Sequence, residues 1–287
     1  MKRAGERMAD RIAGKVVLVA GASSGIGAAL AREFARRGAA VALLARRAGR
    51  LETLAEELRA GGARALALAC DVTVEGDLEA AVARVIGEFG RLDIAVANAG
   101  FGVAGDLAEL TLDDYRRQFE TNVFGVLRTA YAALAPLAAS RGVLVLMGSV
   151  SGHLAAPGAS AYAMSKFAVR ALAEAIRGEL APRGIGVVLV SPGFVASEIS
   201  RVDNHGRFHP DAREPSHRRF EMSAERAARQ IVRAVQRRRR ERVITVHGKV
   251  AVILARHTPR FLAWILATVR PDRPGPSRGD RGGGRDS

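Results

Sequence analysis

The sequence VVLVAGASSGIG, residues 16–27, decides the fold. Its first five residues are aliphatic and predict a buried strand, and the run Ala28–Arg37 that follows has helical character. Glycines between a strand and a helix let the backbone approach a pyrophosphate, whose charge is met by amide N–H groups at the helix start. We therefore interpret this loop as a phosphate cradle, although a glycine-rich turn that only joins strand and helix is the plainer alternative. The residues expected at the phosphates are Gly21, Ser23, Ser24, Gly25, Ile26 and Gly27.

Outward from this loop, short aliphatic runs alternate with longer stretches of helical period, as in βαβ units. The predicted strands are Val16–Ala20, Ala40–Ala45, Ala65–Cys70, Ile94–Ala97, Val143–Met147, Gly186–Ser191 and Arg242–Val246. Amphipathic stretches such as Leu51–Arg59 and Leu78–Phe89 lie between them and predict covering helices. The expected fold class is therefore α/β, a doubly wound Rossmann sheet of seven parallel strands with helices on both faces.

The ends of the chain differ from this pattern. We expect a single domain over residues 14–248, with disordered segments at 1–13 and at 271–287, where Gly, Pro, Arg and Asp predominate. Between them, residues 249–270 predict a helical extension with two short apolar runs around Pro259. Its flanking arginines allow an amphipathic anchor on a membrane. Because the apolar runs are short, packing on protein is the favoured interpretation.

Composition limits the other classes of function. The net charge is +15, but the basic residues are mostly Arg spread along the chain, without a nucleic-acid-binding motif, so no specific nucleic-acid partner is expected. A single cysteine, Cys70, gives no disulfide framework, and neither a signal peptide nor an apolar run of ~18 residues is evident. These features predict a soluble, cytoplasmic protein. The histidines show no metal-ligand spacing, so no metal is expected.

A candidate acid–base pair lies in the helical stretch Ala159–Leu180. Tyr162 and Lys166 are four residues apart and therefore share a helix face. A phenol with a pKa near ~10 is a poor base at neutral pH, and each unit of lowering requires ~1.4 kcal/mol of differential stabilisation of the phenolate. The lysine ammonium can supply it.

Together, the glycine spacing and the Tyr–Lys pair resemble the short-chain dehydrogenase/reductase family over roughly residues 14–246. One departure is Ala20, where the family usually has Thr before the first glycine. The resemblance implies that Ser149, thirteen residues before Tyr162, donates to the substrate carbonyl oxygen. It also implies that Asn122 completes the catalytic group by holding a water that links Lys166 to solvent.

The cofactor implied by the resemblance is a nicotinamide dinucleotide. NAD-binding members carry an acid at the end of the second strand, where this chain has Ala45 followed by Arg46. A guanidinium there can pair with a ribose 2′-phosphate, so NADP(H) is expected in preference to NAD(H). Further expected cofactor contacts are Asp71, Val72, Asn98, Ala99, Gly100, Pro192, Gly193, Val195 and Ser197, together with Tyr162 and Lys166.

The implied reaction interconverts a ketone or aldehyde and an alcohol by hydride transfer, with Tyr162 as the acid and base. Three variable places, Phe101–Gly105, His153–Ser160 and Glu198–Phe220, should choose the substrate, and their apolar residues favour a lipophilic carbonyl compound. The resemblance also implies a homodimer or homotetramer built through Asp113–Ala139 and Ala159–Leu180. An NAD-linked alcohol dehydrogenase and a catalytically silent dinucleotide-binding sensor are the alternatives.

Overall fold

The computed structural model describes residues 12–209, 211 and 221–268, and its parallel sheet confirms the predicted fold class. The strand order is β3-β2-β1-β4-β5-β6-β7, and every neighbouring pair is parallel. The strands are β1 Val16–Ala20, β2 Ala40–Ala45, β3 Ala65–Ala69, β4 Ile94–Ala97, β5 Val143–Met147, β6 Gly186–Ser191 and β7 Glu241–Val243.

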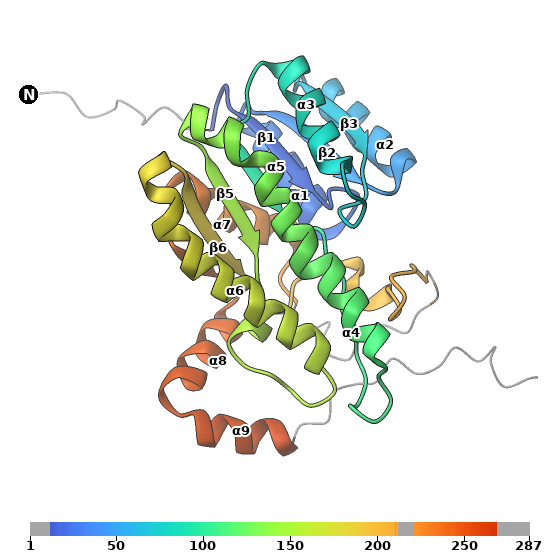
Figure 1. Cartoon of the computed structure of the whole chain (residues 1–287), viewed down its shortest axis with the longest axis vertical. Coiled ribbons are helices and arrows are strands. Elements are labelled where there is room, and N and C mark those ends of the chain that lie inside the picture. Colours follow the sequence, from blue (N-terminus) through green and yellow to red (C-terminus); the bar gives the residue numbers. More distant parts are fainter. Residues whose placement is uncertain (1–11, 210, 212–220, 269–287) are drawn as a thin grey trace, which may run out of the picture.

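Helices cover both faces of this sheet (Figure 1). One face carries α1 Gly25–Arg36, α2 Ala48–Ala60 and α7 Ala224–Gln236. The other carries α3 Asp77–Phe89, α5 Gly125–Ser140 and α6 Ser160–Leu180. Short helical turns lie at η2 Val150–Gly152, η3 Ala181–Arg183 and η4 Glu198–Arg201.

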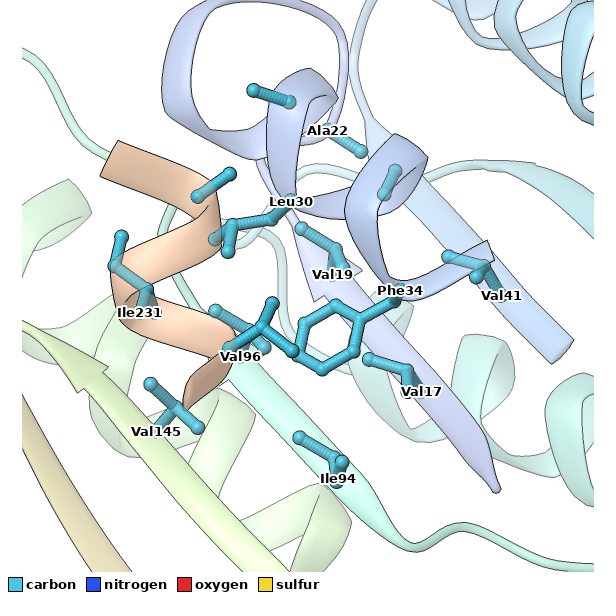
Figure 2. Close-up of a cluster of buried hydrophobic side chains, with 14 of the residues drawn as sticks. Val17, Val19, Ala22, Leu30, Phe34, Val41, Ile94, Val96, Val145 and Ile231 are labelled. Carbon is cyan, nitrogen blue, oxygen red and sulfur yellow. The ribbon is translucent and has the colours of Figure 1, made fainter. Parts of the chain in front are cut away.

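The first of these faces is organised around Phe34 of α1 (Figure 2). Its ring is fully buried and lies among strand residues such as Val17 and Val96, with Ile231 of α7 on the same side of the sheet. Truncating a buried phenylalanine costs about 3–5 kcal/mol, so this contact fixes α1 on β1. The loop that joins the two elements is thereby held at the carboxyl edge of the sheet.

The strand order reverses between β1 and β4. The chain leaves β1 toward β2 and leaves β4 toward β5, so their following loops separate and open a crevice at the carboxyl ends. Ligands of doubly wound sheets bind in such a crevice. The glycine loop after β1 and the turn after β4 therefore meet where a dinucleotide is expected.

Two predicted elements differ from the structure near their ends. The seventh strand, predicted as Arg242–Val246, ends at Val243, because Thr245 caps α8 Val246–His257 by accepting from the Gly248 amide at 3.1 Å. This cap begins the extension three residues earlier than expected, and α9 Pro259–Thr268 completes it. The third strand ends at Ala69 instead of Cys70.

Of the two segments expected to be disordered, residues 1–11 and 271–287 lie outside the described residues. Ile12 and Ala13 are described, and Ile12 is buried in the core cluster under α1. Burial of this side chain moves the start of the folded domain earlier than the predicted residue 14.

The stretch Asp113–Ala139, which we expect at an oligomer interface, forms an interrupted helix. It comprises α4 Leu112–Phe119, a π-helical turn, η1 Glu120–Phe124, and α5. This continuous stretch, Leu112–Ser140, is long and apolar enough to cross a membrane by length and composition, and a third of its most apolar window is buried. Because α5 packs against β4, β5 and α3, its apolar residues are explained by the sheet that it covers.

Candidate active site

The loop after β1 is held closely against the helix that follows it. A Cβ atom added at Gly27 would lie 2.0 Å from the Gly21 carbonyl oxygen, so only glycine permits this turn. Asn98, after β4, donates from Nδ2 to the carbonyl oxygens of Ala20 at 3.2 Å and Gly21 at 3.0 Å. Hydrogen bonds thus join the carboxyl ends of β1 and β4, where the strand order reverses.

This cradle fits the phosphates of a dinucleotide. Ser24 precedes α1 in extended conformation and makes no capping hydrogen bond, which leaves the first-turn amides without a side-chain acceptor. Gly25 faces Ser197 across the loop, where an added Cβ would lie 3.1 Å from that of Ser197. The positively polarised start of α1 therefore presents amides without a side-chain acceptor next to Ser24 and Ser197, and an anion can accept hydrogen bonds from such amides.

Arg46, Arg47 and Arg50 surround the end of β2, and the first two have different roles. Arg46 is exposed and donates to the Gly206 carbonyl at 3.3 Å. Arg47, which the sequence did not single out, turns toward the cradle and donates to Ser23 Oγ at 2.9 Å and to Ser24 Oγ at 2.8 Å. It also pairs with Glu198 at 2.9 Å. The sequence alone does not indicate which of these two adjacent arginines turns toward the cradle.

The other expected cofactor contacts follow β3, β4 and β6. Asp71 accepts from the amide and hydroxyl of Thr73, and Val72 is buried against the start of α5. Ala99 and Gly100 continue the turn that Asn98 begins, and Gly100 lies beside Asn122 and Lys166. The structure therefore gathers these residues at the same edge as the cradle.

Tyr162 and Lys166 share one face of α6, next to the loop that carries Ser149. Lys166 is buried, and its Nζ donates to the Met147 carbonyl at the end of β5 at 2.9 Å. The same Nζ lies 5.7 Å from the centre of the Tyr162 ring. Gly152 holds the serine loop on the helix, because a Cβ there would lie 2.7 Å from the Lys166 carbonyl oxygen.

The environment alters both ionisable groups of this pair. Burial raises the pKa of Tyr162 above its ordinary value, while a hydrogen bond with Ser149 acts in the opposite direction. Burial also lowers the pKa of Lys166 to about 8. Tyr162 is thus a phenol at neutral pH in the free protein, in contact with a serine hydroxyl and close to a lysine that can change its charge.

Asn122 lies in the π-helical turn η1 and is fully buried. Its amide accepts from the Phe101 N–H at 3.1 Å, donates to the Phe101 carbonyl at 3.0 Å and reaches Ser165 Oγ at 3.2 Å. π-Helical turns often occur at functional sites, because the extra residue redirects a side chain. Here the turn ties Asn122 to α6 one residue before Lys166.

The Pro192–Ser197 segment is held by elements from both sides. The Pro192 carbonyl accepts from the Val150 amide at 2.9 Å, and Val195 is buried beside Met222. The Phe194 amide donates to His247 Nε2 at 3.1 Å, and the two rings stack. His247 belongs to α8, so the C-terminal extension contacts the expected nicotinamide side of the site, although the sequence did not single out His247.

His153 belongs to a segment that the sequence assigns to substrate selection, but its side chain points elsewhere. Its side chain is buried and lies 3.2 Å from Ser191 Oγ and 2.9 Å from Glu241. It therefore joins β6 to β7 and does not face a substrate. Phe101 and Val103 are buried near α6, whereas Phe194 is half exposed at the edge of the site.

Comparison with known proteins agrees with this geometry. The family model described as short chain dehydrogenase matches residues 15–207. The chain belongs to this family. It is accordingly an oxidoreductase of the short-chain dehydrogenase type that uses a nicotinamide dinucleotide.

Relatives of this short-chain dehydrogenase carry different names. It is 40% identical over 197 residues to the 11-beta-hydroxysteroid dehydrogenase A of Arachis hypogaea, covering 68% of this chain and only 56% of that protein. It is 38% identical over 253 residues to the A-factor type gamma-butyrolactone 1′-reductase of Streptomyces virginiae, covering 86% of this chain and 97% of the relative.

Solved structures show both forms of the cofactor. A short chain dehydrogenase/reductase from Burkholderia phymatum in complex with NAD has a TM-score of 0.78 at 25% identity, over 92% of this chain and 98% of that one. A short chain dehydrogenase from Burkholderia cenocepacia J2315 in complex with NADP has a TM-score of 0.73 at 31% identity, over 83% and 99%. The fold and the family thus accommodate either dinucleotide.

Proposed function

We propose that this short-chain dehydrogenase interconverts a lipophilic ketone or aldehyde and the corresponding alcohol with NADP(H), using Tyr162 as acid and base. The observation that carries the proposal is the convergence of Ser149, Tyr162 and buried Lys166 beside the glycine cradle. A hydroxyl donor in contact with a phenol, with an ammonium close by, supplies the groups that a carbonyl oxygen needs as it gains negative charge.

The bound nicotinamide supplies the hydride in the reducing direction. Tyr162 gives its phenol proton to the carbonyl oxygen, while Ser149 donates a hydrogen bond to the same atom. The ammonium form of Lys166 favours the phenolate that remains on Tyr162 and would also bind the ribose hydroxyls of the cofactor. Gly21–Gly27 and Asn98 would hold the phosphates and the loop around them.

NADP(H) in preference to NAD(H) is supported by charge at the end of β2. Ala45 provides no carboxylate to bind ribose hydroxyls or to repel a phosphate, and Arg46, Arg47 and Arg50 lie around this position. Arginine binds phosphate by two parallel hydrogen bonds, which favours the dinucleotide with the additional phosphate.

A lipophilic substrate is supported by the apolar residues near Tyr162. Phe101 and Val103 form a small cluster with Ala161, and Phe194 exposes its ring at the other side of the site. The relatives named for hydroxysteroid and butyrolactone chemistry fit a substrate of this class.

The test is turnover with NADPH and with NADH across a panel of lipophilic ketones. We expect ketone-dependent oxidation of NADPH at a higher kcat/KM than that of NADH. A preference for NADH would favour the NAD-linked alternative. Tight NADPH binding without turnover of any ketone would favour a dinucleotide sensor.

We further propose a homo-oligomer through α5 and α6. Both helices expose large apolar or aromatic side chains although each covers the sheet, among them Tyr131, Met164 and Phe167. A second copy would bury these residues on the same two helices of each protomer. Light scattering on the purified chain tests this, and a monomer at micromolar concentration would contradict it.

A further inference from the structure

The C-terminal hairpin α8–α9 begins beside the active site and extends away from the sheet. His247 accepts from the Phe194 amide, and α8 contacts η2 directly after Ser149. Beyond these contacts, α8 and α9 pack on each other and extend past the carboxyl edge of the sheet (Figure 1). Among the residues that the structure describes, much of the hairpin outside these contacts is exposed.

That hairpin exposes large apolar side chains. On α8, Val246, Val250 and Ile253 have spacings of four and three residues, so they share a helix face, and each is more than half exposed. On α9, Phe261 and Trp264 are 53% and 65% exposed, and their rings stack. Large exposed apolar residues gathered on two helices that pack on each other mark an interaction surface.

The charge of the hairpin limits what this surface can bind. No Asp or Glu occurs between Glu241 and Asp272, whereas this stretch contains Arg242, Lys249, Arg256, Arg260 and Arg270. Arg256 and Arg260 are exposed on either side of the bend between the helices. In the part of the chain that the structure describes, no carboxylate pairs with either of them.

We propose that α8–α9 binds the surface of an anionic phospholipid bilayer. Apolar helical residues flanked by arginines, with an exposed tryptophan, are the features by which helices lie in the headgroup region. A second copy is the weaker candidate, because an isologous contact would bring the same acid-free, basic surfaces together. Binding would place the mouth of the active site, at Phe194 and His247, close to the lipid.

The test uses the only tryptophan of the chain, Trp264, as its own reporter. The full-length protein is mixed with vesicles of phosphatidylcholine alone or of phosphatidylcholine with phosphatidylglycerol. We expect a blue shift of the emission and co-flotation with the anionic vesicles only, both weakened by salt. No shift and no flotation with anionic vesicles would overturn the proposal.

Variants separate the two contributions. Because each basic residue near an anionic surface contributes about 1 kcal/mol, Arg256→Glu/Arg260→Glu should weaken the partition into vesicles by more than about tenfold. Phe261→Ser/Trp264→Ser should reduce flotation similarly. The control Leu107→Ser/Arg84→Glu changes an exposed leucine and an exposed arginine outside the hairpin and should bind like the parent.

Thermal unfolding of each variant shows whether it is folded. Folded hairpin variants that float like the parent would contradict the proposal. So would loss of an oligomer in light scattering with unchanged flotation, because this result assigns the surface to a second copy.

Discussion

Glu198 forms a 2.9 Å ion pair with Arg47, the arginine that also donates to both serine hydroxyls of the glycine cradle. The same carboxylate pairs with Arg50 at 2.7 Å. These neighbours lower the pKa of Glu198 in spite of partial burial, which raises it, so the group is a carboxylate at neutral pH. In the free protein, the carboxylate of Glu198 thus occupies the two guanidinium groups that we expect to face the 2′-phosphate of NADP(H).

Glu198→Gln should therefore tighten NADPH binding. The substitution removes a carboxylate that competes with phosphate for Arg47 and Arg50, and pairs of this exposure contribute about 0.2–1 kcal/mol each. We expect the Kd for NADPH to fall about threefold, with little change for NADH, as measured by fluorescence titration at fixed ionic strength.

A matched control is Glu57→Gln, which breaks another exposed ion pair, with Arg32. It should leave both dissociation constants unchanged. Weaker NADPH binding in Glu198→Gln would show instead that the carboxylate supports the site.

Arg47→Ala should weaken the preference for NADPH over NADH. A hydrogen bond to a charged group contributes about 1.5–3 kcal/mol, so loss of this guanidinium should raise the KM for NADPH roughly tenfold or more. NADH lacks the additional phosphate and should change much less. Steady-state kinetics with both cofactors measure the ratio, and equal losses for both would indicate that Arg47 only supports the loop.

Much of the fold was predictable because buried parallel strands are nearly continuous aliphatic runs, as in β1 and β5. The seventh strand was misplaced for a physical reason. Its β-branched sequence favours a strand, but Thr245 also caps a helix, and the cap determines where α8 begins. The π-helical turn at Asn122 was not predictable, because the spacing of the apolar residues does not distinguish it from a continuous α-helix.

The candidate site was predictable in its types of residue but less so in their contacts. The structure brings Ser149, Tyr162 and Lys166 together as expected. The sequence led us to Arg46, but nothing in it distinguishes Arg46 from the chemically identical Arg47. It placed Glu198 only within a substrate-selecting segment, and it did not predict the contact of Glu198 with Arg47 or that of His247 with Phe194. Those contacts join residues far apart in the chain and depend on loop conformation.

Gly27→Ala should abolish dinucleotide binding. The added methyl would collide with the Gly21 carbonyl oxygen at 2.0 Å, so the backbone of the cradle must shift. Gly178→Ala is the control, because an added Cβ there meets nothing within 4 Å and the residue lies inside α6. This control should bind normally and gain about 0.5–1 kcal/mol in stability. Normal dinucleotide binding by Gly27→Ala would contradict the claim that the loop Gly21–Gly27 holds the phosphates.

Lys166→Met should change how stability depends on pH. The folded pKa of Lys166, about 8, is below its ordinary value of 10.5, so charging the lysine opposes folding. This penalty is full below the folded pKa and disappears as the pH rises through the ordinary value. From about pH 7 to about pH 10, the parent should gain about 2 kcal/mol relative to the variant.

Urea unfolding of the cofactor-free proteins at both pH values measures this difference. An equal offset between parent and variant at the two pH values would show that Lys166 has the same pKa in the folded and unfolded chains.

The most direct test of the central claim is single-turnover ketone reduction by Tyr162→Phe, with the NADPH Kd measured on the same sample. The account predicts that the variant binds NADPH within about twofold of the parent and loses at least about a hundredfold in rate, the contribution of a positioned acid. Reduction at the parental rate would contradict the assignment of Tyr162 as the acid and base.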